Sequence, residues 1–200
     1  MEEAEVMAEV STGAAPSSRE KILVAARSVA QTRGYNGLSY RDLAREVGIK
    51  AASVYHYFPS KAELGAAVAR RYWEDSAAAL ESLSAGPSDP MTALRRYPVT
   101  FRKALEDDNR MCLCSFMAAE FDDLPEPVQK EVQTFADVNV AWLSKVLSEA
   151  SVVGPEESES RARAIFAAVA GAQLIARSRS DLSLYDALIE SYRAAGLLPG

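Results

Sequence analysis

The chain has 200 residues, of which 48% are apolar and 25% charged, and its formal net charge is −6. These values are typical of a globular protein with a sizeable core, and two cysteines exclude a disulfide-stabilised framework. No apolar run reaches the roughly 18 residues that a membrane span needs, and the acidic start MEEAEVMAEV resembles neither a secretory signal nor a transit peptide. Because Ala and Leu dominate the apolar set, we expect a soluble, cytoplasmic, mainly helical protein with no membrane partner.

The basic residues are concentrated near one end of the chain. Residues 1–16 contain four Glu and no base, whereas residues 17–61 contain eight Lys or Arg and three Asp or Glu. The remaining residues, 62–200, are acidic overall. A polyanionic partner would therefore meet only one end of the protein, although a solvated basic face would produce the same pattern.

The first part of the chain is predicted to be a tail followed by a helix. Residues 1–16 lack hydrophobic periodicity and are predicted to be disordered. Ser17 and Glu20 have the spacing of a capping box, in which each residue satisfies a free backbone donor of the other. Gly34 is the expected end of the helix that they open.

The next residues are predicted to form two short helices separated by a tight turn. The turn falls at Gly48, between a helix over Ser39–Val47 and a helix over Lys50–Tyr57. Pro59 ends the latter, and the capping box Ser60-x-x-Glu63 opens a long fourth helix to about residue 83. Three short helices in about forty residues match a helix-turn-helix unit, although an ordinary helical corner would have the same pattern of helix starts and stops.

The third predicted helix supplies candidate base-reading residues. A recognition helix reads base edges with its first residues, which are Lys50, Ala51, Ala52 and Ser53. Lys50 is suited to guanine, and small side chains let the backbone approach the DNA. Lys and Tyr side chains supply phosphate contacts, which fix register more than sequence.

The rest of the chain is also predicted to be helical, so the expected fold class is all-α. Further helices are expected at about 91–106, 110–121, 125–150, 161–177 and 181–195, and the acidic run EESES after Gly154-Pro155 is expected to be a loop. The predicted domains are a disordered tail at 1–16, a helix-turn-helix domain at 17–63 and a larger helical domain at 64–200.

The helix-turn-helix segment resembles the N-terminal domain of TetR/AcrR-type transcriptional regulators. The matching residues are Ala25-Ala26, Gly34-Tyr35, Ser39-x-Arg41-Asp42-Leu43-Ala44, Val47-Gly48-Ile49 and Val54-Tyr55-x-Tyr57-Phe58-x-Ser60-Lys61-x-x-Leu64. The family usually has glycine where this sequence has Ala52. The resemblance covers about residues 17–65 and implies a DNA-binding domain followed by a larger ligand-binding and dimerisation domain.

The resemblance also implies the residues that contact DNA and the mode of assembly. Carried over by position, the DNA-binding residues are Ser39, Tyr40, Arg41, Lys50, Ala51, Ala52, Ser53, Tyr55, Tyr57 and Lys61, the last being the usual phosphate clamp. The family implies a homodimer, joined through the last two helices at about 161–177 and 181–195, on a palindromic double-stranded DNA operator. The small apolar run Ala164–Ala172 suits such an interface, although a monomer core would also bury it.

The middle helices are expected to hold a pocket for a small-molecule effector. Its candidate residues are Trp73, Tyr97, Phe101, Cys112, Phe116, Phe135, Asn139 and Trp142, with Tyr72 and Met117 as further candidates. As a set they indicate a mostly apolar pocket with few polar anchors. Each of them taken alone is equally consistent with core packing.

Cys112 and Cys114 stand close together in the sequence. With His56 as the single histidine, one chain cannot build a four-ligand zinc site, so no metal or other cofactor is expected. Side chains two apart on a helix point in different directions, which opposes a disulfide. If Asp108 or Asn109 caps the sixth helix, Cys112 lies in its first turn, where backbone N–H groups favour a thiolate. Packing as small apolar residues is the alternative.

A second resemblance concerns the same region. Cys112-Leu113, Ala119-Glu120, Leu124, Val128 and the run Gly171-Ala172-x-Leu174-x-Ala176-x-Ser178-Arg179-Ser180 are similar to one TetR branch. That branch includes repressors that respond to electrophiles and to acrylate-like molecules, and in its electrophile sensors the reactive cysteine falls where Cys112 stands.

The functional hypothesis is a dimeric repressor that a small molecule releases from its operator. An electrophile acting on Cys112 is one version, and a reversible apolar ligand with structural cysteines is the other. An enzyme is not expected, because the chain has no Gly-rich phosphate loop or metal motif and its one histidine lies in the helix-turn-helix unit. A helical scaffold without DNA affinity is a further alternative, and the sequence does not separate a repressor from an activator.

Overall fold

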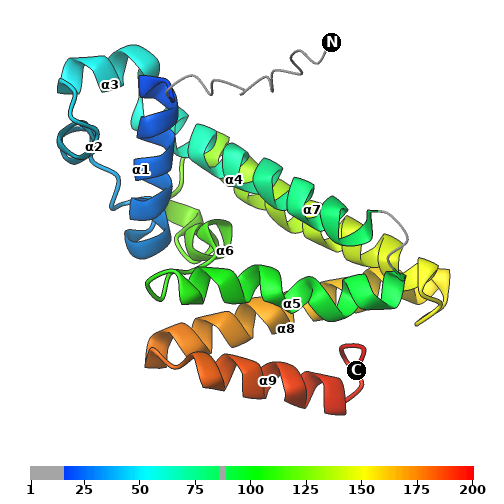
Figure 1. Cartoon of the computed structure of the whole chain (residues 1–200). Coiled ribbons are helices and arrows are strands. Elements are labelled where there is room, and N and C mark those ends of the chain that lie inside the picture. The colour runs from blue at the N-terminus through cyan, green and yellow to red at the C-terminus, as the bar shows by residue number, and fades with distance from the viewer. Residues whose placement is uncertain (1–15, 86–88) are drawn as a thin grey trace, which may run out of the picture.

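The structure, a computed structural model, describes residues 16–85 and 89–200. Within these two stretches the regular elements are helices and there is no β-strand, which confirms the predicted all-α fold. Figure 1 shows α1, α2 and α3 grouped at one end, with α4 leading from them into a larger helical body. All but the last residue of the predicted disordered tail lies outside the described residues.

The first three helices begin and end at local sequence signals. They are α1 Ser18–Arg33, α2 Tyr40–Val47 and α3 Ala51–Tyr57. The Ser17 hydroxyl accepts a hydrogen bond from the Glu20 N–H at 3.2 Å, and Gly34 ends α1 with a left-handed φ of 67°. Ile22, Leu43 and Val54 are buried where the three helices meet.

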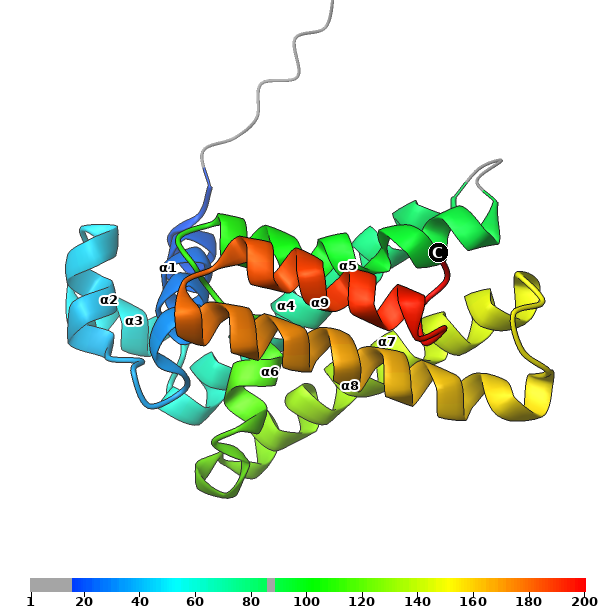
Figure 2. The same cartoon turned by 90° about the horizontal axis from the view of Figure 1, so that it is seen from below.

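The larger body is built around two long helices that pack against each other. Its elements are α4 Lys61–Ser84, α5 Pro90–Glu106, α6 Leu113–Ala118, the 3-10 turn η1 Phe121–Asp123, α7 Glu126–Glu149, α8 Pro155–Arg179 and α9 Leu182–Ala194. Helices α4 and α7 lie side by side, α7 also packs on α8, and α9 packs on α8 and α5 (Figures 1 and 2). The proposed domain boundary between residues 63 and 64 falls in the first turn of α4, so one continuous helix runs through both units.

The sixth helix is shorter than the predicted 110–121. It begins at Leu113 and ends at Ala118. Asp108 and Asn109 have left-handed φ values of 59° and 52°, a conformation that a right-handed helix cannot contain. The loop after α5 therefore continues past the two residues that were expected to cap α6.

The acidic run 156–160, predicted to be a loop, forms the first turns of α8. Gly154 is the N-cap, Pro155 is the first helical residue, and Glu156 and Glu157 lie in the first turn. Proline is pre-organised for the first helical position, and the positive end of the helix dipole favours carboxylates there. The local signals thus mark a helix start, and the loop prediction was wrong.

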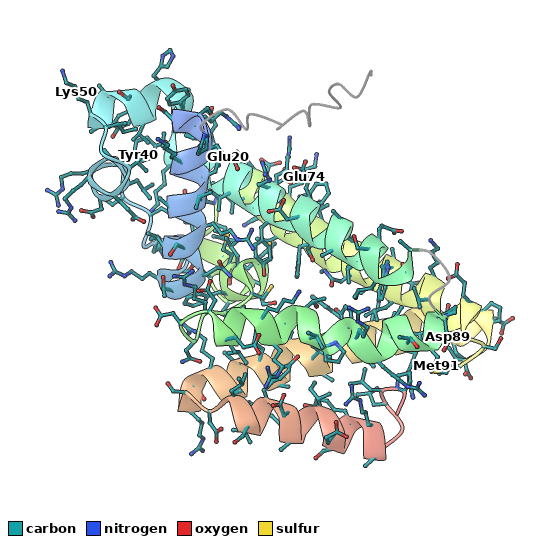
Figure 3. The ribbon with its side chains drawn as sticks, in the orientation of Figure 1. Glu20, Tyr40, Lys50, Glu74, Asp89 and Met91 are labelled. Carbon is teal, nitrogen blue, oxygen red and sulfur yellow. The ribbon has the colours of Figure 1, made fainter. Side chains whose placement is uncertain are left out.

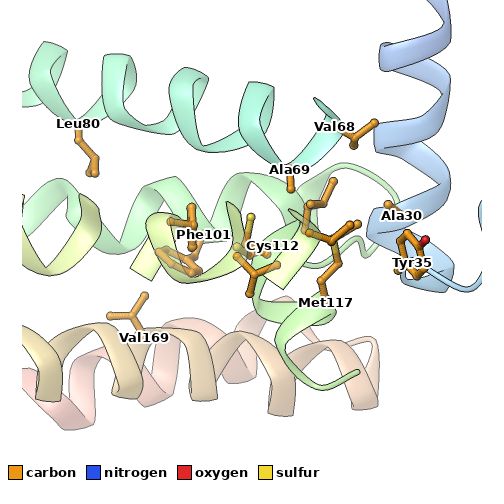
Figure 4. Close-up of a cluster of buried hydrophobic side chains, with 14 of the residues drawn as sticks. Ala30, Tyr35, Val68, Ala69, Leu80, Phe101, Cys112, Met117 and Val169 are labelled. Carbon is orange, nitrogen blue, oxygen red and sulfur yellow. The ribbon is translucent and has the colours of Figure 1, made fainter. Parts of the chain in front are cut away.

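The core is continuous from α1 to α9, and α6 lies inside it. Figure 4 shows Phe101, Cys112 and Met117 between the ribbons of α4 and α8. Tyr97, Leu113 and Leu143 are among the side chains with no exposure or almost none. In the stretches that the structure covers, no helix is long and apolar enough to cross a membrane.

Glu131 is a buried carboxylate at the contact between α4 and α7. It is 4% exposed, and it accepts hydrogen bonds from the Arg70 guanidinium at 2.6 and 3.2 Å and from Trp73 Nε1 at 2.8 Å. Burial acts to raise its pKa, but the hydrogen bonds from Arg70 and Trp73 outweigh burial and leave the pKa lowered. The ionised carboxylate is therefore the form that joins the two helices.

We predict that Glu131→Gln destabilises the protein at pH 7 by about 1–2 kcal/mol, because charged hydrogen bonds to Arg70 and Trp73 are weakened. A lowered folded-state pKa stabilises the fold above the unfolded-state pKa, and this contribution is lost as the pH falls through the folded-state value. In urea denaturation, the difference in free energy of unfolding between wild type and variant should therefore be constant from about pH 7 to about pH 5 and narrow only as the pH falls below about 4.5. Glu81→Gln, an exposed site on α4, is the control. A difference that does not change with pH would contradict the assignment.

Candidate nucleic-acid interface and effector region

The turn between α2 and α3 determines how α3 is presented. Gly48 has φ 76° and ψ 34°, a left-handed conformation that glycine adopts without strain. The Ile49 N–H reaches back to the Ala44 carbonyl at 2.9 Å and closes α2. Leu43 and Val54, 1% and 0% exposed, hold the two helices together from the inside. The other faces of α3 are consequently exposed to solvent.

The outer face of α3 carries small side chains first and aromatic side chains later. Ala52, Tyr55, His56 and Tyr57 are exposed, and Ala51 and Ser53 are half-buried. Lys50 is the N-cap residue of α3 and is exposed, and Figure 3 shows it at the outer end of the helix pair. A helix whose leading end carries a lysine and small residues can enter the major groove of DNA.

Tyr40, predicted to contact DNA, belongs instead to the interior of this unit. Its side chain is 9% exposed, and its hydroxyl donates to the Phe58 carbonyl at 2.7 Å. Burial, with smaller contributions from Tyr55 and Glu63, raises the pKa of Tyr40 to about 12. Tyr40 therefore joins α2 to the end of α3 and supports the exposed Tyr55, whose ring centroid lies 4.5 Å away.

The other predicted contacts outside α3 remain accessible. The Ser39 hydroxyl accepts from the Asp42 N–H at 3.4 Å, which leaves its hydrogen for another acceptor, and Arg41 is exposed. The Lys61 ammonium donates to the Asn36 carbonyl at 3.2 Å. Because an ammonium has three N–H donors, two remain for a phosphate oxygen.

Five of the eight predicted effector-binding residues form one packed cluster. These residues are Tyr97, Phe101, Phe135, Asn139 and Trp142, and each is at most 5% exposed. The Tyr97 ring stacks on Trp142 with centroids 5.8 Å apart, and the Tyr97 hydroxyl donates to Asn139 Oδ1 at 3.0 Å. Phe101 and Phe135 both pack against Phe166. The large side chains thus fill the space in which a pocket was expected.

Trp73 and Phe116 lie apart from this cluster. The Trp73 indole N–H donates a hydrogen bond to Glu131. The Arg177 guanidinium lies over the Phe116 ring, 4.9 Å from its centroid. The structure therefore does not gather the eight residues around one cavity. Six of the eight residues are aromatic, and burying large apolar side chains is also what a core requires.

An open cleft of about 510 Å³ lies between α1, α4 and α5. Its polar lining residues include Arg27, Gln31, Tyr72, Asp75, Lys103, Asp107 and Arg110. None of the eight predicted effector-binding residues lines it, although Tyr72 was among the further candidates. Ten of its thirteen lining residues are polar or charged, so the cleft does not carry the aromatic signal on which the sequence prediction depended.

Cys112 immediately precedes α6 and is not in its first turn, which corrects the predicted placement. Its side chain is 2% exposed, and its N–H donates to Gln173 Oε1 at 2.9 Å. Burial raises the pKa of the Cys112 thiol, and the neighbouring Ser115 and Tyr72 only partly oppose this. The environment therefore favours the thiol, whereas the sequence had suggested a thiolate.

Cys114 is also enclosed, at 1% exposed. Burial, followed by the neighbouring Cys112 and Glu131, raises its pKa. Among the residues that the structure describes, no group of three His, Cys, Asp or Glu side chains is placed to hold a metal ion.

The outer face of α8 exposes large apolar side chains. Leu174 and Ile175 are 52% and 46% exposed, and Ala164 and Ala167 are exposed on the same helix. Together with the half-buried Gly171, positions 164, 167, 171 and 174 or 175 follow one another at steps of three or four residues, which places them on one face. Figure 2 shows α8 and α9 lying together on the side of the molecule turned toward the viewer. An exposed apolar face of this kind is typical of a protein interaction surface.

Comparison with known proteins identifies relatives over nearly the whole chain. Residues 22–68 match the family model described as "Bacterial regulatory proteins, tetR family". The structure of a TetR transcriptional regulator from Legionella pneumophila is 30% identical with a TM-score of 0.85, covering 90% of this chain and 98% of that one. A TetR-family regulator from Agrobacterium tumefaciens is 31% identical with a TM-score of 0.80, covering 86% and 93%.

The chain is also similar to a transcriptional repressor of Escherichia coli. The HTH-type transcriptional repressor NemR of Escherichia coli strain K12 is 27% identical over 179 residues, covering 86% of this chain and 90% of NemR. These relatives are transcriptional regulators and not enzymes. Their similarity extends through the larger helical body as well as the helix-turn-helix unit. This similarity, together with the left-handed turn at Gly48 and the outward face of α3, shows that the chain belongs to the TetR family of bacterial regulatory proteins.

Proposed function

We propose that the chain acts as a dimeric repressor that binds a palindromic operator and is released from it by a small molecule. The observation that carries this proposal is the outward face of α3, with Lys50 at its leading end and small residues in its first turn. In a helix-turn-helix protein this end of the recognition helix reads base edges in the major groove.

The proposed DNA contacts divide into base reading and phosphate binding. Lys50 is suited to guanine, and the methyl groups of Ala51 and Ala52 are suited to thymine methyl groups. Ser53 belongs with the base-reading residues in the first turn of α3. Phosphate contacts, which set the register of α3, are assigned to Ser39, Arg41, Tyr55, Tyr57 and Lys61. Tyr40 is removed from this set, because its hydroxyl is bonded within the protein.

The exposed face of α8 supports the proposed dimer. A second copy would cover Leu174 and Ile175, which are otherwise large apolar side chains in water. Two copies related by a two-fold axis would present two α3 helices, and a palindromic operator mirrors that symmetry.

The effector proposal favours a reversible ligand over an electrophile that attacks Cys112. The buried thiol has a raised pKa, and only a thiolate reacts readily. The open cleft, in contrast, is accessible and is bordered by α1 of the DNA-binding unit as well as by α4 and α5. A molecule bound there would contact both units and so bias their relative position.

We predict that Lys50→Ala lowers the preference for operator over random DNA by about 1–3 kcal/mol, because it removes a base contact. Fluorescence anisotropy titrations on both DNAs would measure the two affinities. The contrasting variant is Lys61→Ala, which should weaken binding to both DNAs alike and reduce the slope of log affinity against log salt by about 0.9. A Lys50→Ala protein with unchanged preference would refute the base-reading assignment.

We predict that Ile175→Glu converts the dimer to a monomer and abolishes tight operator binding, because it places a charge in the proposed interface. Light scattering coupled to size exclusion would report the mass, and circular dichroism would confirm the helical fold. Val99→Glu is the matched control, since Val99 on α5 is 45% exposed against 46% for Ile175. An Ile175→Glu protein that stays dimeric would show that α8 is not the interface.

We predict that N-ethylmaleimide labels Cys112 more slowly than free cysteine at about pH 7, with a rate that rises about tenfold per pH unit to beyond pH 9, because the reactive thiolate is scarce below the raised pKa. Mass spectrometry of wild type, Cys112→Ser and Cys114→Ser would assign the label. Fast labelling of Cys112 at about pH 7, together with loss of operator binding, would instead support the electrophile version.

A further inference from the structure

The turn that follows α1 is held by a carboxylate from the larger helical body. Glu120, between α6 and η1, accepts a hydrogen bond from the Tyr35 N–H at 2.7 Å through Oε2. Its other oxygen, Oε1, accepts from the Asn36 side-chain amide at 3.3 Å. Both donors belong to the same turn, so one side chain orients the backbone and the first polar side chain of that turn.

Gly34 is required for this arrangement. A Cβ atom at this position would lie 2.2 Å from Glu120 Oε2 and 2.6 Å from its carboxyl carbon, distances that real atoms do not tolerate. Gly34 also has the left-handed φ of 67° that ends α1. The turn is thus shaped to admit the carboxylate, which distinguishes it from an incidental surface contact.

The same turn also contacts Lys61. The Lys61 ammonium donates to the Asn36 carbonyl at 3.2 Å and lies 4.7 Å from the centroid of the Tyr35 ring. The Tyr35 ring in turn lies against the backbone of α4, because a Cβ added at Gly65 would be 2.6 Å from its Cε2 atom. The position of the ammonium therefore depends on Tyr35 and Asn36, the two residues that Glu120 orients.

A second connection joins the same end of α1 to the start of α6. The Gln31 side-chain amide donates to the Met111 carbonyl at 3.0 Å, and the Met111 N–H approaches the Gln31 carbonyl at 3.4 Å. Gln31 and Met111 are both buried. The segment from Met111 to Glu120 is consequently attached at one end to α1 and at the other to the turn that follows it, which leaves the turn little freedom relative to the larger body.

We infer that Glu120 is a positioning residue for DNA binding: it holds the turn formed by Tyr35 and Asn36 so that the Lys61 ammonium points toward a DNA phosphate. This inference rests on the proposed DNA contact of Lys61. Glu120 itself does not touch DNA in this role. Its effect on affinity passes entirely through Lys61.

The test measures operator affinity for Glu120→Gln, Lys61→Ala and the double variant across a range of salt concentrations. One lost phosphate contact lowers the salt slope by about 0.9, which corresponds to about eightfold weaker binding at about 0.1 M salt. Glu120→Gln should show most of this loss, because an amide has one acceptor oxygen and cannot accept from both the Tyr35 N–H and the Asn36 side-chain amide. The double variant should bind like Lys61→Ala alone, a non-additivity that a general loosening of the fold would not produce.

The matched control is Asp123→Asn, which removes the same charge from an exposed residue of η1. Its affinity should equal or slightly exceed that of wild type, because a negative charge is removed. Asn36→Ala, at an exposed residue, provides a milder second variant, and it should lower the affinity and the salt slope in the same direction. Thermal melting would be recorded for every variant.

Three outcomes would overturn the inference. Glu120→Gln and Asn36→Ala could match Asp123→Asn in affinity and slope, or the losses from Glu120→Gln and Lys61→Ala could multiply in the double variant. In both cases Glu120 only stabilises the fold, while a lower slope for Lys61→Ala would still support the proposed function. If wild type itself shows no salt-dependent DNA affinity, the proposed function fails and the inference fails with it.

Discussion

The arrangement of the two units depends on α4, one continuous helix that belongs to both. Near its start Lys61 contacts the turn after α1, and farther along Arg70 and Trp73 bind the buried Glu131 of α7. Its middle is also paired with α1, since Arg27 and Asp75 lie 3.0 Å apart. A helix held on both sides cannot shift at one end without changing contacts at the other. This property makes α4 a suitable mechanical link between the larger body and the DNA-binding unit.

Buried polar side chains lie at the junctions between helices. Gln173 of α8 accepts from the Cys112 N–H and donates to the Phe101 carbonyl at 2.7 Å, and so joins three elements. Gln31 joins α1 to the segment before α6, and Asn139 joins α7 to Tyr97 of α5. A buried polar group without a partner is costly, so each of these bonds specifies one relative placement of the helices it connects. An effector that moves these helices must exchange these bonds for others.

The chain is acidic overall but has a basic reading end, and this distribution suits its proposed partner. The excess of bases in residues 17–61 gives the surface around α3 an attraction for DNA that the rest of the chain does not share. Such an asymmetry steers one end of the protein toward a polyanion. Glu120 is acidic, but its carboxylate accepts N–H groups of the turn after α1. In the proposed role it therefore supports the basic surface by ordering that turn.

The sequence by itself determined the helices, the turn at Gly48 and the family. Helix starts at Ser17, Ser39 and Ser60 were predictable because a capping hydroxyl acts on a backbone N–H only three residues away. A local helix-start signal is also present at Pro155, so the acidic run that follows it forms the first turns of α8 and not the predicted loop.

Only the tertiary structure decided which side chains are exposed and what surrounds them. Tyr40 is interior because the Phe58 carbonyl lies next to it in space, and the Cys112 thiol is held protonated because distant helices exclude water from it. The aromatic residues expected around a pocket pack on one another, while the open cleft is lined by charged residues from α1, α4 and α5. Burial and its effect on pKa depend on neighbours brought together from far along the chain, and no local pattern specifies those neighbours.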